Sequence, residues 1–195
     1  MSDKRLRDQT DEELILEFQK TGDTDIFEVL VQRYKNPLFN FVFRFLGDRD
    51  STADVVQETF IKVYKNKDSY KTFAKFSTWI YTIAGNLAKT ELQRRKRKNQ
   101  VSINSWGEDE ETMELPDGGP LPDKLVDMGI KNKMIQDALL KLPEVYREMI
   151  ILRDIQELSY EEIAEVMDIS IGTVKSRINR GRSQLQELLK DIFKE

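Results

Sequence analysis

The sequence predicts an all-α protein with two small helical domains joined by an acidic flexible linker, the second domain containing a helix-turn-helix. Apolar residues recur at the i, i+3 and i+4 spacing of helices through most of the 195 residues, and no segment alternates like a β-strand. This periodicity fails over residues 99–130, which divides the helical sequence into two parts. Near the C-terminus a tight turn joins an acidic helix to a basic one, which is typical of a helix-turn-helix.

The composition narrows the classes of function. The net charge is −4, so any contact with nucleic acid must come from local basic patches. The chain has neither cysteine nor histidine, which excludes a disulfide framework and the commonest zinc ligands and removes the commonest general base. We therefore expect no metal and no cofactor. No apolar run is long enough to span a bilayer, so we expect a cytoplasmic protein without direct membrane insertion.

Two helices are predicted at the start of the chain. Thr10 and Glu13 have capping-box spacing, which predicts a short helix over residues 11–20. Gly22 ends this helix. A second apolar repeat of helical period covers residues 26–45.

The second predicted helix contains Pro37, which predicts a kink or a break because proline lacks a backbone N–H donor. Gly47 then closes the segment. A third helix is predicted over residues 51–65. Its expected buried residues are Ala53, Val56, Phe60 and Val63.

Like charges lie one turn apart on the third helix, at Asp54 and Glu58, with Gln57 between them. Two carboxylates at this spacing cost a little helix stability. Such a pair usually lies on a face that is exposed to solvent. The alternative is that the pair binds a basic surface of a protein partner.

A fourth helix is predicted from residue 75 to residue 100, and its last turns are strongly cationic. Its apolar stripe runs from Phe76 to Leu87, so the last turns project beyond the core. The cations there are Arg94, Arg95, Lys96, Arg97 and Lys98. A helix C-terminus favours one or two cations, but five in succession indicate a phosphate backbone as the partner.

The segment before the fourth helix interleaves aromatic side chains with lysines. These residues are Lys67, Tyr70, Lys71, Phe73, Lys75 and Phe76. Bases stack on rings while cations follow the backbone, so this pattern suits single-stranded nucleic acid. The alternative is that Phe73 and Phe76 simply pack beneath the loop.

Residues 99–130 are predicted to form the linker. They contain eight acidic residues against one lysine, and three of the five prolines of the chain. This composition favours an extended or disordered segment, and the plain alternative is a solvated spacer between two domains.

The C-terminal part begins with a predicted helix over residues 131–142, and Pro143 suits the first turn of the next helix. Ser159 and Glu162 form a second capping-box pattern. A short turn over residues 168–170 then leads into the last helix. The spacing predicts a helix-turn-helix.

The last helix has an apolar stripe and a basic face. The stripe is Val174, Ile178, Gly181, Leu185 and Leu188. The opposite face and its flanks hold Ser170, Gly172, Thr173, Lys175, Ser176, Arg177, Asn179, Arg180, Arg182 and Ser183. Small and hydrogen-bonding residues let a helix enter the major groove, where arginine and asparagine read base edges. The alternative is a solvated basic face.

Three segments, in their order and spacing, resemble the extracytoplasmic-function (ECF) class of bacterial RNA polymerase sigma factors, in the sigma-70 family. They are ADVVQETFIKVYKN, FSTWIYTIAGNLAKTELQRRKRK and LPEVYREMIILRDIQELSYEEIAEVMDISIGTVKSRINRGRSQL. The resemblance implies a non-enzymatic factor that binds core RNA polymerase, recognises −35 and −10 promoter elements and opens the strands. It implies a region 2-like domain over residues 1–98, the acidic linker over 99–130, and a region 4-like domain over 131–195.

The resemblance also implies roles for single residues. Asp54, Gln57 and Glu58 would meet the β′ clamp helices of the polymerase, and the C-terminal domain its β flap. The loop with Tyr70, Phe73 and Phe76 would capture a flipped base of the −10 element. The −10 non-template strand would meet Thr78, Tyr81, Thr82, Asn86 and Lys89, and the cations at residues 94–98 would meet phosphates. The last helix would read the −35 duplex.

At two positions this sequence differs from the pattern of the family, and the resemblance also implies one further partner. Thr90 stands where relatives often carry an aspartate, so no −10 preference is carried over. Gly85, in the middle of a helix, costs about 1 kcal/mol relative to alanine in intrinsic propensity. An anti-sigma factor, often anchored in a membrane, is the further partner.

Two other classes of function compete with this interpretation. A stand-alone helix-turn-helix regulator would explain the C-terminal part but would leave the QETF segment and the aromatic loop without a role. A nuclease that holds magnesium with aspartate and glutamate would need a catalytic motif, and the sequence contains none that we can identify.

Overall fold

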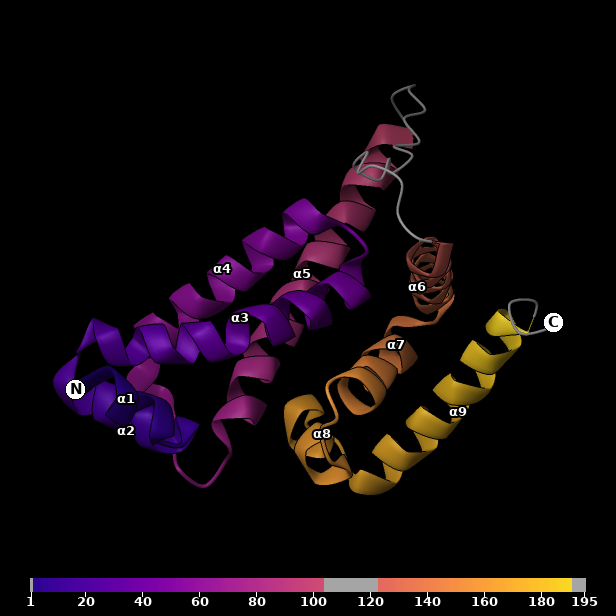
Figure 1. Ribbon diagram of the computed structural model, residues 1–195. Helices are drawn as coiled ribbons and strands as arrows, with labels where there is room; N and C mark the ends of the chain where they lie inside the picture. Colours follow the sequence, from indigo (N-terminus) through magenta and orange to yellow (C-terminus); the bar gives the residue numbers. More distant parts are fainter. Residues whose placement is uncertain (1, 104–122, 191–195) are drawn as a thin grey trace.

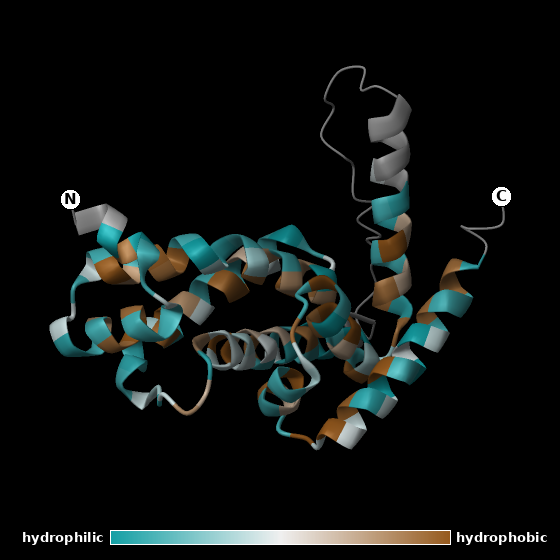
Figure 2. Ribbon diagram, turned by 60° about the horizontal axis from the view of Figure 1, so that its bottom comes forward, coloured by the Kyte–Doolittle hydropathy of each residue, from teal (hydrophilic) through white to brown (hydrophobic). Residues whose placement is uncertain are grey.

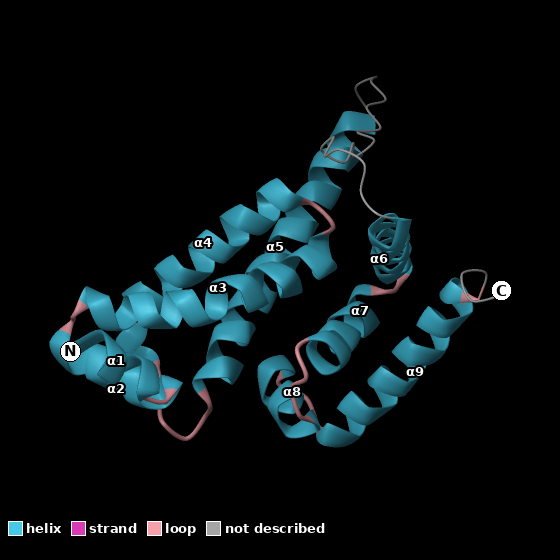
Figure 3. Cartoon of the chain, viewed as in Figure 1, coloured by secondary structure: helices cyan, strands magenta, loops and turns pink. Residues whose placement is uncertain are grey.

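The computed structural model describes residues 2–103 and 123–190, with side chains described for residues 5–98, 129 and 131–190. Within these ranges every regular element is helical, which confirms the predicted fold class (Figure 3). Most of the predicted linker, residues 104–122, lies outside the described residues.

The described elements fall into an N-terminal and a C-terminal group of helices (Figure 1). The first group consists of α1 (Ser2–Asp8), α2 (Asp11–Thr21), α3 (Thr24–Leu46), α4 (Arg49–Lys65), the 3₁₀ turn η1 (Lys67–Ser69) and α5 (Phe76–Ile103). The second consists of α6 (Asp123–Lys141), α7 (Glu144–Ile150), the π-helical turn η2 (Ile151–Ile155), α8 (Tyr160–Met167) and α9 (Ile171–Leu189).

The predicted helix ends are confirmed where caps define them. The Thr10 hydroxyl accepts the Glu13 N–H at 3.2 Å, while the Glu13 carboxylate accepts the Thr10 N–H at 2.8 Å. Ser159 and Glu162 repeat this reciprocal pair at the start of α8. Gly22 ends α2 with a left-handed φ of 70°, a conformation that glycine adopts without steric cost.

Helix α3 is continuous through Pro37, so of the two predicted outcomes, a kink or a break, the break is wrong. Proline inside a helix removes one backbone hydrogen bond and costs about 3 kcal/mol or more. Burial of Leu30, Leu38 and Phe41 on both sides of the proline holds the helix together by packing.

The predicted linker, residues 99–130, overlaps helices at both of its ends, since α5 continues to Ile103 and α6 begins at Asp123. An acidic residue at the first position of α6 suits the positive end of the helix dipole. In addition, α1 was not predicted, and the helix expected after Pro143 is divided into α7 and η2.

The two helical groups pack directly on each other and share one continuous apolar core. Helix α8 lies against α5, while α6 and η2 lie against α3 (Figure 1). Arg147 of α7 donates to the Phe45 carbonyl at 2.7 Å, and its guanidinium lies 5.6 Å from the centre of the Phe45 ring. The hydropathy view shows hydrophobic residues interspersed with hydrophilic ones along the helices of both groups (Figure 2).

Candidate nucleic-acid interface

Helix α9 presents the predicted basic face to solvent. Val174, Ile178 and Gly181 are buried beneath it, as predicted, whereas Leu188 is exposed. A Cβ on Gly181 would lie 3.0 Å from Cγ1 of Ile150, so the glycine lets α9 pack closely on α7. The exposed residues of the predicted face are Ser170, Gly172, Lys175, Ser176, Asn179, Arg180, Arg182 and Ser183, and Thr173 and Arg177 are half-buried.

Some polar side chains of α9 are held by neighbours. Arg182 forms two hydrogen bonds with the Asp154 carboxylate, at 2.5 and 3.1 Å, which raise the pKa of Arg182. Lys175 lies 5.9 Å from the centre of the Tyr160 ring. Asn179 and Arg180 are exposed on the same face.

The aromatic loop is divided between exposed and buried rings. Phe73 is 90% exposed, whereas Tyr70 and Phe76 are 3% and 0% exposed. The Tyr70 hydroxyl donates to the Ala74 carbonyl at 2.7 Å, and the Tyr70 ring packs on Trp79. Packing beneath the loop is therefore the right interpretation for Phe76 and the wrong one for Phe73.

The cations of this loop also differ in accessibility. Lys71 is exposed. Lys67 donates to the Gln19 carbonyl at 3.1 Å and lies 5.3 Å from the centre of the Phe18 ring. Lys67 thus ties the loop to α2, and of the two lysines Lys71 is the one available to a phosphate.

One stripe of α5 is covered by the second helical group. Thr78 and Tyr81 were expected on the exposed side of this helix, but both are 4% exposed, so that expectation is wrong. The Tyr81 hydroxyl donates to Oε1 of Gln156 at 2.6 Å, across the contact between the two groups. Thr82 and Lys89 on this stripe are half-buried, and Asn86 at its flank is exposed. Tyr81 is held between the Phe41 ring of its own group, at 5.4 Å between ring centroids, and Gln156 of the distant second group, a contact that local sequence does not encode.

The cationic end of α5 is partly neutralised. The half-buried Glu91 accepts hydrogen bonds from Arg94 and Arg95 at 2.7 to 3.0 Å. These bonds lower the pKa of Glu91 to about 2, and the bond from Arg94 makes the largest contribution. Arg95 also pairs with Asp48 at 2.7 Å, and Lys96 pairs with a glutamate of α7. Arg97 and Lys98 are exposed at the end of this row.

The third predicted surface lies on α4, where Asp54, Gln57 and Glu58 are all exposed. An apolar hollow of about 330 Å³ adjoins Gln57, lined in part by Phe60 and by Tyr64, which is 44% exposed. Sequence analysis assigned Phe60 to the core and did not consider Tyr64. A signal was present, since Gln57, Ile61 and Tyr64 recur at helical spacing on one face.

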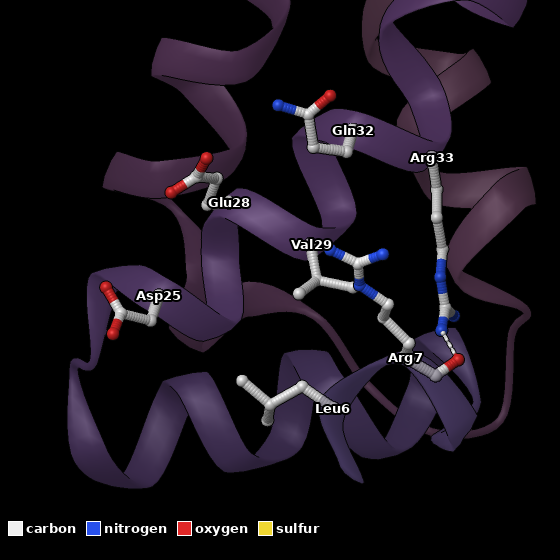
Figure 4. Close-up of a pocket in the computed structure, with 7 residues that line it drawn as sticks. All are labelled: Leu6, Arg7, Asp25, Glu28, Val29, Gln32 and Arg33. Carbon is white, nitrogen blue, oxygen red and sulfur yellow. Dashed lines mark hydrogen bonds between the residues drawn. The ribbon is translucent and has the colours of Figure 1, made fainter. Parts of the chain in front are cut away.

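A hollow of about 660 Å³ lies between α1 and α3 (Figure 4). Its lining contains none of the predicted site residues, and Arg33 closes one side by donating to the Arg7 carbonyl at 2.8 Å. Among the described side chains, those of residues 5–98, 129 and 131–190, no group of three or more acidic residues is placed to hold a metal ion. Over residues 2–103 and 123–190, no helix has the length and apolarity to cross a membrane.

Two family descriptions match the chain, "Sigma-70 region 2" over residues 30–98 and "Sigma-70, region 4" over residues 132–185. The chain is 40% identical over 176 residues to the ECF RNA polymerase sigma factor SigW of Bacillus subtilis, covering 89% of this chain and 94% of the relative. It is 34% identical over 194 residues to the ECF RNA polymerase sigma-E factor of Escherichia coli K12, covering 97% and 100%.

Solved structures give the same result for the fold. The sigma factor RpoE of Bartonella quintana, solved in complex with the anti-sigma factor NepR, superposes with a TM-score of 0.67 at 29% identity, covering 84% of this chain and 96% of that one. CnrH, solved in complex with the cytosolic domain of CnrY, superposes with a TM-score of 0.70 over 94% of this chain and 99% of that one. At 22% identity CnrH supports the fold alone.

Proposed function

The chain is an RNA polymerase sigma factor of the ECF class, and from that premise we propose how its surfaces divide the work of promoter recognition. The exposed face of α9 would read the −35 duplex. The loop before α5, with the free face and cationic end of that helix, would bind the −10 element. The α4 surface would bind core polymerase.

The observation that carries this proposal is the exposed face of α9. Asn179 and Arg180 project from a helix whose opposite side is anchored by Val174 and Ile178, both 0% exposed. The preceding helix α8 is short and doubly capped, and Asp168 turns the chain sharply with a φ of 52°. A rigid support of this kind holds a reading helix in one orientation, which base-edge contacts require.

The −10 role rests on the loop and on α5. Phe73 is a ring exposed on a loop with Lys71 nearby, which suits stacking on an unpaired base while a phosphate is neutralised. Tyr70 and Phe76 would support Phe73 from below, by packing. Arg97 and Lys98 would contact phosphates at the far end of the helix.

The polymerase role rests on α4. Asp54 and Glu58 hold two exposed negative charges beside the apolar hollow at Phe60 and Tyr64. Anchoring rings next to charged rim residues are common at protein interfaces. We therefore extend the proposed polymerase contact from Asp54, Gln57 and Glu58 to Tyr64.

Control by an anti-sigma factor belongs to the same proposal. The RpoE structure, at 29% identity, contains a sigma factor bound to its anti-sigma factor. A comparable partner would hold this protein in the cytoplasm, or at a membrane if that partner is anchored there. The protein itself would catalyse no reaction and would lend recognition to the polymerase.

Run-off transcription on a library of random promoters tests the proposal, with core polymerase alone, the protein alone and both together. We expect a defined pair of −35 and −10 sequences to emerge only when both proteins are present. Arg180→Ala should relax the −35 preference, and Lys190→Ala, which removes an exposed cation beyond the proposed face, should not. Unchanged transcription together with binding to duplex DNA by the protein alone would instead favour the stand-alone regulator.

A further inference from the structure

Helix α2 holds both ends of the loop that connects α4 to α5. This loop, residues 66–75, contains η1 and the exposed Phe73, and α2 packs on η1 and on α5. The side-chain amide of Gln19 on α2 donates to the Lys67 carbonyl at 2.6 Å and to the Tyr70 carbonyl at 3.2 Å. In return, the Lys67 ammonium donates to the backbone carbonyl of Gln19 at 3.1 Å. The first half of the loop is therefore bonded to a single residue of α2.

A glutamate of α2 holds the other end of the loop. The Glu12 carboxylate accepts the Phe76 N–H, the first N–H of α5, at 2.9 Å. The first turn of α5, residues 76–79, contains no acidic residue of its own. The negative charge that favours a helix start is therefore supplied by α2, 64 residues earlier in the chain. The capping box of Thr10 and Glu13 fixes the start of α2, where Glu12 lies.

Between these two attachments the tip of the loop is exposed, but its ends are joined. Lys71, Thr72 and Phe73 form the tip, and all three are exposed. The Tyr70 hydroxyl donates to the Ala74 carbonyl at 2.7 Å, which connects one end of the tip to the other. The tip thus stands on a fixed base, while its own side chains face solvent.

We propose that Gln19 and Glu12 are positioning residues for strand opening. Both are half-buried, and they act through the backbone groups on either side of the tip. Their bonds hold Phe73 and Lys71 in one arrangement towards the −10 strand. A loop that is already ordered loses less conformational entropy when it binds an unpaired base, so it binds more tightly. This inference rests on the proposed −10 role of the loop.

Two sets of variants of the full chain, assembled with core polymerase, test the proposal. Gln19→Met removes the donated hydrogen bonds and keeps a side chain of similar length. Its matched control is Gln32→Met, the same change at an exposed glutamine of α3. Glu12→Ala removes the acceptor of the Phe76 N–H, whereas Glu12→Gln keeps an amide oxygen that can accept it.

Three readouts are taken at a temperature at which circular dichroism shows every variant to be folded. Permanganate reactivity of −10 thymines measures opening, and a gel shift on a duplex that ends upstream of the −10 element measures −35 binding. Hydrogen exchange of residues 67–76 measures the order of the loop. We expect Gln19→Met and Glu12→Ala each to lower opening about tenfold, since two ordinary hydrogen bonds, or one to a charged group, correspond to about that factor. The loop should exchange faster in both variants, and −35 binding should stay unchanged.

The conservative variant Glu12→Gln should keep most of the opening, and Gln32→Met all of it. Wild-type opening in Gln19→Met or in Glu12→Ala would overturn the role of that residue, because its bonds would then serve stability alone. An equal loss of opening and of −35 binding would also overturn the proposal, because the effect would not be confined to the loop.

Phe73→Ala is measured in parallel, so that the proposed function is tested separately. Opening that survives Phe73→Ala would contradict the proposed −10 role of the loop. Opening that is lost in Phe73→Ala but kept in Gln19→Met and Glu12→Ala would contradict only the positioning by α2.

Discussion

Replacing Gly85 by alanine should separate the two groups of helices without weakening α5 itself. The new Cβ would lie 2.8 Å from Oε1 of Glu148, closer than Cβ atoms ordinarily approach a neighbour. Glu148 is 2% exposed, so its carboxylate has no room to swing into solvent while the groups stay in contact. Forcing an extra methyl group into a packed site costs about 1–3 kcal/mol.

The same change stabilises the helix in isolation. Alanine is favoured over glycine by about 1 kcal/mol inside a helix. The gain applies to α5 whether or not the two groups of helices are in contact, whereas the clash applies only while they are in contact. The equilibrium constant for contact between the two groups should therefore fall by about one to two factors of ten, since 1.4 kcal/mol corresponds to a factor of ten.

Energy transfer between fluorescent labels at Asn40→Cys and Gln184→Cys, two exposed positions in a chain without cysteine, measures the contact between the two groups. Hydrogen exchange of the α5 amides measures the stability of the helix. Gly129→Ala is the matched control, because Gly129 is also in a helix but a Cβ there would meet nothing within 4 Å. We expect Gly85→Ala to lower energy transfer while α5 stays protected. Unchanged energy transfer with a raised melting temperature would refute the reasoning, since the glycine would then serve no close contact.

Three further predictions concern single residues. Phe73→Ala should abolish promoter opening in a transcription assay without changing the melting temperature, because the ring is 90% exposed. The same change at a buried ring, Phe76→Ala, should lower the free energy of unfolding by about 3–5 kcal/mol in chemical denaturation, because that ring is 0% exposed. Glu91 has a pKa lowered from 4.5 to about 2, so its contribution to stability is present above pH 4.5 and lost as the pH falls toward 2, and Glu91→Gln should flatten this part of the stability–pH curve. Ser159→Ala should destabilise α8 by about 1 kcal/mol and weaken binding to −35 duplex DNA, and a melting temperature equal to that of the wild type would contradict the capping role.

Sequence analysis succeeded where the determinants are local. The capping boxes at Thr10 and Ser159 and the turn before α9 depend on residues within one helical turn, and all are present in the structure. It failed on the buried face of α4. Thr52 and Thr59 are buried there, whereas Ala53 is exposed and Phe60 half-buried.

The failure on α4 has a physical cause. The Thr52 hydroxyl donates to the Asp48 carbonyl at 2.5 Å and the Thr59 hydroxyl to the Val55 carbonyl at 2.7 Å. A hydroxyl satisfied within its own helix can be buried at little cost, so threonine behaves as an apolar residue there. A sequence pattern based on apolar residue types therefore does not identify these threonines as buried.

The covered stripe of α5 is beyond sequence reasoning for a different reason. Thr78, Tyr81 and Lys89 form a polar face that local rules assign to solvent. The partners of Tyr81 and Lys89 are Gln156 and Glu148, which lie about 60 to 75 residues away in the chain. Gly85, unexplained by helix propensity, was the one local sign of a close approach.

The central claim is that this protein opens promoter DNA together with core polymerase. Permanganate probing of unpaired thymines, on a promoter selected from the random library, tests it most directly. The account predicts reactive thymines in the −10 element only when the protein and core polymerase are both present, and their loss with Phe73→Ala. Duplex binding by the protein without reactive thymines, with or without core polymerase, would contradict it.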